Sequence, residues 1–324
     1  MVTRIFQVMV GLLVASAGFA WAQDYPAKPI VLTVPFAAGG PTDTLARNLA
    51  QVMGGNLKQQ IIVENVAGAG GTIAYAKVAK GRPDGYNVLL AHIGMSTAPA
   101  LYRKPAVNPL TDYEYVGQVA DVPMTLIAKK GLPAENFKDF LAYFKANSKK
   151  MTYGNAGLGA ASHLCGLLFL STVQIDTQTV SYKGTAPAMA DLMGGHIDFM
   201  CDQTTNTTAP IKAGSVKAYG ATSARRIPSL PDLPTLQENG LKGFEVVVWH
   251  GLYLPKGTPK PVVDRLVSAL QAAVKDPGLK AKLAELGAEP VPVEKANPQS
   301  LQQHLKAEIA KWDPIIKKAG VYAD

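Results

Sequence analysis

Two glycine-rich segments contain the residues best suited to bind an anion. The first, Gly39-Gly40, lies between an apolar, β-branched run at 30–36 and a stretch whose apolar residues recur at the spacing of one helix face. Glycine lets the backbone turn sharply and leaves the first N–H groups of the helix uncovered. Because a helix N-terminus carries partial positive charge, we expect this loop to bind a carboxylate or phosphate, a tight turn without ligand being the alternative.

The same pattern of strand, glycine loop and helix recurs about thirty residues later. Residues 61–65 have the composition of a short strand, and Gly68-Ala69-Gly70-Gly71 leads into a second helical pattern. Parallel strands joined by right-handed crossovers place both loops at the same edge of a sheet. The second loop does not fit the dinucleotide fingerprint, because Ile73 stands where glycine is required. The pair of loops therefore predicts one anion site.

Further polar residues follow predicted strands and could contact a ligand. His92 and His163 fall in predicted loops at the binding edge, where they could donate to a second carboxylate or be purely structural. Polar side chains at equivalent strand ends in the second half could select the distal part of the ligand. These are Asn155, Ser162, Thr185, Asp202 and Gln203. Asp202 would repel an anion, so we expect it to accept from a hydroxyl, a ring N–H or water.

Asp43, in the predicted first helical turn, has two interpretations. A carboxylate there is favoured by the helix dipole, so we prefer a role in orienting the loop over direct contact with the ligand. Enzymatic functions have little support, since the sequence lacks G-x-S-x-G and H-E-x-x-H motifs and its five histidines and two cysteines show no metal-ligand spacing. We predict no metal and no cofactor.

The N-terminus predicts export. Residues 1–22 combine Arg4, an apolar stretch and Ala20-Trp21-Ala22, which is the pattern of a secretory signal peptide. The apolar stretch falls short of the roughly 20 residues that span a bilayer. Removing it takes one basic residue from a formal charge of +8, giving +7 (8 − 1). No basic run indicates nucleic-acid binding. The signal peptide leads us to expect a bacterial periplasm as the location of the mature protein, which we expect to be a monomer.

The two cysteines suit that oxidising compartment. Cys165 lies early in a predicted helix and Cys201 at the end of a predicted strand, so both could meet at one sheet edge. A disulfide is our hypothesis, and two free thiols remain the alternative because spacing does not fix geometry.

The order of predicted elements indicates two similar α/β halves, the second inserted into the first. Segments 116–120 and 123–128 are read as separate extended segments, the second crossing into the other half, and 217–222 as the returning strand. We therefore predict one lobe from 23–125 plus 224–324 and another from 126–223. Two crossings make a hinge, and a ligand would bind between the lobes.

Several stretches along the whole mature chain resemble the Bug family, the periplasmic receptors of tripartite tricarboxylate transporters. They include Val34-Pro35-Phe36-x-x-Gly39-Gly40-x-x-Asp43-x-x-Ala46-Arg47, Gly68-Ala69-Gly70-Gly71, Pro83-Asp84-Gly85-Tyr86, Tyr182-Lys183-Gly184-Thr185-Ala186-Pro187, Gly194-Gly195-x-Ile197-Asp198 and Leu230-Pro231-Asp232-x-Pro234-Thr235. The resemblance implies an α/β, two-lobed type II periplasmic binding-protein fold with a hinge and an interlobe cleft. It also implies delivery of a carboxylate to the membrane subunits of a transporter.

In the resembled family, two loops of lobe one hold a carboxylate through backbone N–H groups and water. The matching residues here are Phe36, Ala37, Ala38, Gly39, Ala69, Gly70, Gly71 and Thr72. The chain departs from the family where Ala38 replaces a usual proline and Val66-Ala67 replace arginine and proline. These departures affect the mouth of the expected pocket.

We therefore expect a receptor that closes on a small organic acid, an aliphatic dicarboxylate or an aromatic acid such as terephthalate. Phe36 at the mouth of the pocket favours an aromatic or semi-apolar acid. One alternative is a sensor that signals to a membrane kinase, and a weaker one is a periplasmic enzyme.

Overall fold

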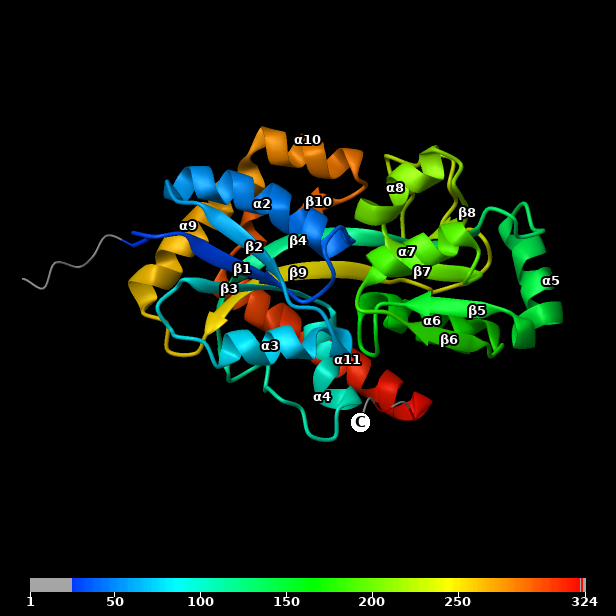
Figure 1. Ribbon diagram of the computed structural model, residues 1–324, viewed down its shortest axis with the longest axis horizontal. Coiled ribbons are helices and arrows are strands. Elements are labelled where there is room, and N and C mark those ends of the chain that lie inside the picture. The colour runs from blue at the N-terminus through cyan, green and yellow to red at the C-terminus, as the bar shows by residue number, and fades with distance from the viewer. Residues whose placement is uncertain (1–24, 321, 323–324) are drawn as a thin grey trace, which may run out of the picture.

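The computed structural model describes residues 25–320 and 322. Two α/β lobes lie side by side, and the long strands β4 and β9 run between them (Figure 1). The predicted signal peptide at 1–22 falls outside the described residues. Within the described chain, no helix combines the length and apolar character needed to span a bilayer.

The strands and helices have the following bounds. The strands are β1 (Ile30–Val34), β2 (Ile61–Asn65), β3 (Asn87–His92), β4 (Tyr113–Lys129), β5 (Thr152–Asn155), β6 (Gln178–Ser181), β7 (Phe199–Gln203), β8 (Val216–Ala221), β9 (Val247–Pro255) and β10 (Glu289–Pro290). The α-helices are α2 (Pro41–Leu57), α3 (Thr72–Ala79), α4 (Gly94–Leu101), α5 (Phe137–Asn147), α6 (Ala161–Val173), α7 (Thr185–Gly194), α8 (Thr204–Lys212), α9 (Lys260–Lys275), α10 (Pro277–Glu285) and α11 (Pro298–Ala319). Short 3-10 turns are η1 (Ala69–Gly71), η2 (Ser148–Lys150) and η3 (Val293–Lys295).

The first lobe is built on β1, which pairs in parallel with β2 and β3. Its residues are β-branched or leucine and almost all buried, as a strand covered on both faces requires. The carboxyl ends of the three strands therefore lie at one edge of the sheet, which confirms that the two glycine loops share an edge. β9 and β4 extend this sheet in antiparallel fashion.

A single strand, β4, carries the chain from one lobe to the other. It pairs with β9 from Tyr113 to Pro123 and with β7 from Met124 to Ala128. The prediction of two separate segments was wrong, because β9 pairs continuously with the Asp121-Val122 stretch that appeared to divide them. The partner of β4 changes from β9 to β7 after Pro123, at the start of the predicted crossing segment. The predicted residue boundaries of the two lobes remain predictions.

The second lobe repeats the plan of the first, with β5 parallel to β6 and β7. Its sheet continues through β4 to β8. Just after β8, the carbonyl of Thr222 accepts from the N–H of Val246, which directly precedes β9, at 3.0 Å. The sequence predicts a helix over 137–146 with Asn136 as its cap, and Asn136 caps α5, accepting from the N–H of Asp139 at 2.9 Å. The sequence also predicts helices at 261–275, 277–286 and 298–318, and α9 to α11 lie there.

Two helices, α4 and α8, were not predicted. Each is short and contains an internal proline, Pro99 or Pro210, which reads as a helix breaker in sequence. Both helices are held by tertiary packing, α4 against α11 and α8 against α2 and β4.

The predicted disulfide is present. Cys165 of α6 is bonded to Cys201 of β7, with their Cα atoms 6.1 Å apart. Cys201 lies in the middle of β7 and directly precedes Asp202, whereas the sequence had placed it at the strand end. The bond thus ties helix α6 to the strand that carries the predicted ligand-facing residues.

Candidate ligand-binding site

A small pocket lies between the lobes at the carboxyl ends of β3 and β7. It is lined by Phe36, Pro41, Thr42, His92, Ala156, Ala160, Ala161, Ser162, Thr185, Asp202 and Gln203. The space that a water-sized sphere can fill is about 10 Å³, roughly that of one water. The lobes therefore lie close together in this structure, and a larger ligand requires them to separate.

Three helices begin at this pocket. Pro41 and Thr42 open α2, Ala161 and Ser162 open α6, and Thr185 opens α7. None of their capping residues provides a side-chain hydrogen bond to the first turn. The first-turn N–H groups therefore keep their partial positive charge for an anion.

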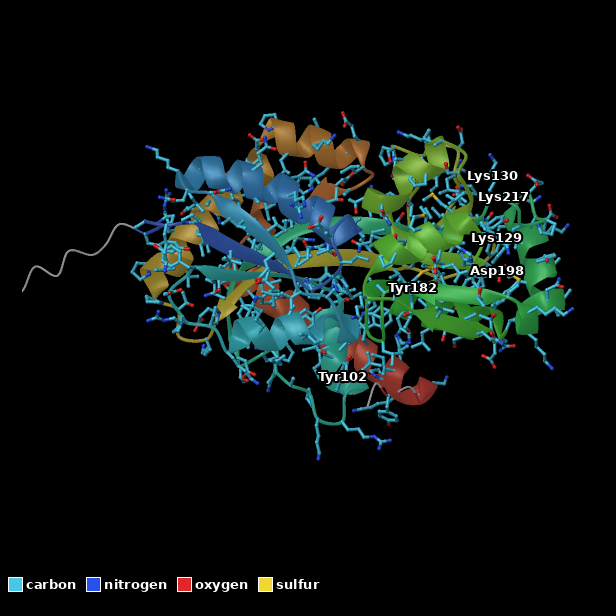
Figure 2. All side chains as sticks on the ribbon, viewed as in Figure 1. Tyr102, Lys129, Lys130, Tyr182, Asp198 and Lys217 are labelled. Atoms are coloured by element: carbon cyan, nitrogen blue, oxygen red, sulfur yellow. A yellow bond between two sulfur atoms is a disulfide. The ribbon has the colours of Figure 1, made fainter. Side chains whose placement is uncertain are left out.

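No lysine or arginine is among the residues that line the pocket, and Asp202 is the charged residue of the set. A cluster of charged side chains lies on the second lobe away from the cleft, where Lys129 pairs with Asp198 at 2.7 Å (Figure 2). Lys130 and Lys217 lie in the same region. The electrostatic attraction for an anion at the pocket must therefore come from backbone dipoles.

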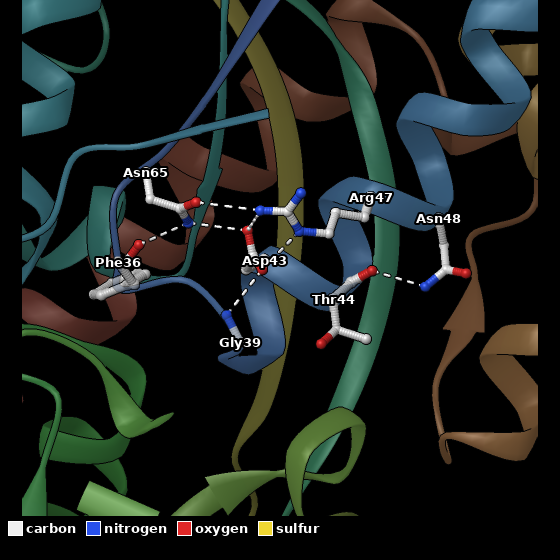
Figure 3. A network of polar contacts seen from close by, with 7 residues as sticks. All are labelled: Phe36, Gly39, Asp43, Thr44, Arg47, Asn48 and Asn65. Atoms are coloured by element: carbon white, nitrogen blue, oxygen red, sulfur yellow. Dashed lines mark hydrogen bonds and ion pairs between the residues drawn. The ribbon is translucent and has the colours of Figure 1, made fainter. Parts of the chain in front are cut away.

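The first glycine loop is held by Asp43 (Figure 3). Its carboxylate accepts from the N–H of Gly39 at 2.9 Å, from Arg47 at 2.9 and 3.0 Å, and from Asn65 at 3.0 Å. Asn65 also donates to the carbonyl of Phe36 at 3.0 Å. Burial raises the pKa of Asp43, but the hydrogen bonds outweigh it and hold the pKa below its usual value. These contacts are the ones expected of a residue that orients the loop.

His92 presents a hydrogen-bond donor at the pocket. Its Nδ1 accepts from the N–H of Gly94 at 2.9 Å, and its ring stacks on Phe36 with centroids 4.7 Å apart. Burial lowers the pKa of His92 to about 4, so the ring is neutral at pH 7. With Nδ1 accepting, the proton is assigned to Nε2.

His163 has the same arrangement in the second lobe. Its Nδ1 accepts from the N–H of Gly159 at 3.2 Å, and burial lowers its pKa to about 4. It lies in the first turn of α6 and not in a loop as predicted, because the helix begins at Ala161. His163 is not among the residues that line the pocket.

The side chain of Phe36, from the first lobe, contacts the second lobe across the cleft. It packs with Ala156 and Ala160 of the second lobe in a small apolar cluster and is 5% exposed. Since one face of its ring lies on His92, little of the ring is available to stack on a ligand in this arrangement.

The second lobe supplies most of the polar side chains. Ser162 accepts from the N–H of Ala156 at 2.8 Å and keeps its hydroxyl proton to donate. Asp202 is fully buried, and burial raises its pKa to about 6. Asn155 lies just behind the lining residues, with its Oδ1 bonded to Gly157 and its Nδ2 unpartnered.

Hydrogen bonds and close packing join the two lobes around the pocket. The N–H of Ala37 donates to the carbonyl of Lys183 at 3.0 Å, and Thr97 donates to the carbonyl of Gly159 at 3.2 Å. The second glycine loop also faces the opposite lobe, where a β-carbon at Gly70 would lie 1.9 Å from the oxygen of Leu158. This loop thus forms part of the interlobe contact.

The structure brings only part of the predicted site to the pocket wall. The predicted residues that line it are Phe36, His92, Ser162, Thr185, Asp202 and Gln203. The others lie in the surrounding loops and helices or, for Asn155, at the end of strand β5, and are Ala37, Ala38, Gly39, Asp43, Ala69, Gly70, Gly71, Thr72, Asn155 and His163. Five lining residues were missed, namely Pro41, Thr42, Ala156, Ala160 and Ala161. Their only sequence signal was proximity to the glycine loops, since four of the five carry no polar side-chain group.

The chain matches a known family over most of its length. The model for the tripartite tricarboxylate transporter family receptor, TctC, matches residues 45–321. The chain is also similar to the solved periplasmic binding protein BugD, with 52% identity and a TM-score of 0.90 over 92% of this chain and 99% of that one.

Two similar structures contain carboxylates. MatC of Rhodopseudomonas palustris, with bound malate, is 36% identical with a TM-score of 0.87 over 90% of this chain and all of that one. A protein of R. palustris with adipate is 34% identical with a TM-score of 0.88 over 92% of this chain and 99% of that one. The predicted fold class is thereby confirmed, and the family is one of periplasmic solute-binding receptors, not enzymes. This chain belongs to the TctC family, the Bug-type receptors of tripartite tricarboxylate transporters.

Proposed function

We propose that the protein captures a small organic carboxylate between its lobes and delivers it to the membrane subunits of a tripartite tricarboxylate transporter. One observation carries the proposal: three helix N-termini without side-chain caps open onto one interlobe pocket. Each helix end acts as about half a positive charge. Together with the neutral donor His92, they match a carboxylate without requiring a cationic side chain.

We infer that a short aliphatic dicarboxylate requires less opening of this pocket than terephthalate. The enclosed space is small, and the ring of Phe36 already stacks on His92 and packs on the second lobe. A flat aromatic acid would require Phe36 to leave these contacts. The malate and adipate in the similar structures support the aliphatic class.

Binding and release would accompany separation and closure of the lobes. The backbone contact from Ala37 to Lys183 and the packing of Gly70 on Leu158 form only when the lobes are together. A carboxylate bound to α2 on one side and to α6 and α7 on the other would stabilise the closed form, which presents a different surface to the transporter. We also propose that residues 1–22 direct export of the protein and that the mature protein is a monomer.

A thermal-shift screen of the mature protein tests this function. The panel holds mono-, di- and tricarboxylates, aliphatic and aromatic, with sugars and inorganic phosphate as controls. A ligand that binds only the folded state raises the melting temperature by mass action, so we expect shifts confined to carboxylates. Shifts with sugars alone, or no shift with any acid, would reject the proposal.

A further inference from the structure

Helix α8, which connects β7 to β8 in the second lobe, makes a separate set of contacts with the first lobe. The hydroxyl of Thr204 donates to the carbonyl of Gly287 at 2.9 Å, and the hydroxyl of Thr208 donates to the carbonyl of Leu286 at 3.2 Å. Both threonines are buried, and neither is among the residues that line the pocket. The two acceptors directly follow α10, which packs on α2 and α9 of the first lobe. Figure 1 shows α8 and α10 next to each other at the top of the molecule.

This contact suits the ends of the two helices. The last carbonyl groups of a helix lack partners within it and carry partial negative charge, whereas the first turn of a helix is partly positive. Because α10 ends at Glu285 and α8 begins at Thr204, the hydroxyls of α8 satisfy carbonyl groups just beyond the end of α10. The packing is also close, since a β-carbon on Gly287 would lie 2.9 Å from the β-carbon of Thr204.

Other side chains fix α8 within the second lobe. Asn206 donates to Asp202, which lines the pocket, at 2.6 Å. The hydroxyls of Thr207 and Thr125 are hydrogen-bonded at 2.8 Å, and Thr125 lies in the part of β4 that pairs with β7. One short helix thus contacts the pocket wall, the strand that links the lobes and the end of α10 in the first lobe.

We propose that Thr204 and Thr208 form a latch that holds the lobes closed and strengthens ligand binding without contacting the ligand. This inference rests on the proposed function, because it concerns the closure that captures the ligand. Separation of the lobes moves α8 away from α10 and breaks both bonds. Interactions made only in the closed form favour that form, and ligand affinity rises with the fraction of the protein that is competent to bind.

Removal of the two hydroxyls tests the latch. The double variant Thr204→Val, Thr208→Val keeps the β-branching and nearly the size of both side chains. If the free chain is mainly open, calorimetric titration of the mature protein with malate should show about fivefold weaker binding for each single variant and at least tenfold for the double variant. If the free chain is mainly closed, small-angle X-ray scattering without ligand should show a larger radius of gyration for the double variant than for the wild type.

Two further variants separate a latch from a merely structural role. Thr207→Val removes a buried hydroxyl from the same helix, but its bond with Thr125 lies within the second lobe. It should lower the urea midpoint while leaving the malate affinity and the radius of gyration at their wild-type values. The double variant Thr204→Ser, Thr208→Ser retains both hydroxyls and should bind malate within twofold of the wild type.

Wild-type values of both the affinity and the radius of gyration in the double valine variant would overturn the latch. Changes of the same size in Thr207→Val would also overturn it. If the double valine variant does not fold, the two single variants are judged by the same criteria. If the wild type binds no dicarboxylate, the proposed function fails, and the scattering of the ligand-free chains alone decides whether the latch exists.

Discussion

Gly70 of the first lobe lies directly against Leu158 of the second. A β-carbon built on Gly70 would lie 1.9 Å from the carbonyl oxygen of Leu158. No real β-carbon approaches a backbone atom this closely, so the lobes can meet here only because residue 70 has no side chain. The glycine loop therefore permits closure as well as exposing backbone N–H groups.

Gly70→Ala should weaken carboxylate binding at least tenfold by holding the lobes apart. Gly214→Ala is a matched control, because Gly214 has nearly the same φ (+63° against +60°) but nothing within 4 Å of the added carbon. Both variants should lose about 1 kcal/mol of folding stability from backbone strain. Calorimetry with the best carboxylate separates them, and wild-type affinity in Gly70→Ala would contradict this account of closure.

Asp43→Asn should destabilise the first loop. The substitution removes the charge that binds Arg47 and disturbs the bond to Gly39, so we expect a loss of about 2 kcal/mol in the free energy of unfolding. Asp264→Asn is the control, because Asp264 forms an exposed i,i+4 pair with Lys260 whose loss should cost under about 0.5 kcal/mol. Urea titration measures the free energy of unfolding of both variants. Equal losses would show that the Asp43 network stabilises the fold no more than an exposed ion pair does.

Loss of the disulfide should destabilise the second lobe. In the chain-entropy model, a bond that closes a loop of this length, with a separation of 36 residues, contributes about 4 kcal/mol. The double variant Cys165→Ala, Cys201→Ala should therefore unfold at lower urea than the oxidised wild type and match the reduced wild type more closely. If oxidised and reduced wild type unfold at the same urea concentration, the bond does not stabilise the fold.

Stability should fall between pH 7.5 and pH 5.0. Burial lowers the pKa of His92 and of His163 to about 4, so below the ordinary value of 6.5 the unfolded chain takes up protons that the folded chain does not. Each histidine should lower the free energy of unfolding by about 2 kcal/mol at pH 5.0. Asp202 acts in the opposite direction, because burial raises its pKa to about 6 and the folded chain binds a proton more readily than the unfolded chain. It should raise the free energy of unfolding at pH 5.0 by about 1 kcal/mol.

Urea midpoints at the two pH values measure this dependence. His163→Gln should lose less stability than the wild type on acidification, since one of the contributing groups is gone. A wild-type midpoint that stays constant or rises at pH 5.0 would contradict the buried, neutral state of these rings.

The framework of the fold could be predicted from sequence because its signals are local. The β-branched residues of β1, the glycines at 39 and 40 and the cap at Asn136 each determine structure within a few residues. Helix α8 could not be predicted in this way. Its threonine-rich sequence with Pro210 has little intrinsic helical preference, and contacts with α2 and β4 hold it in place.

The pocket was predicted only where chemistry is visible in the side chain. His92 and Asp202 stood out as polar residues at strand ends, whereas Ala156 and Ala160 line the pocket through shape alone. The stacking of Phe36 on His92 depends on the distance between loops far apart in the chain. No periodicity or spacing reports such a distance.

A crystal structure of the mature protein with the tightest-binding dicarboxylate tests the central claim most directly. We predict carboxylate oxygens within 3.2 Å of first-turn N–H groups of α2 on one side and of α6 or α7 on the other, with the lobes slightly farther apart than in this structure. A ligand bound outside the cleft, or held by lysine or arginine side chains without contact to these helix ends, would contradict it.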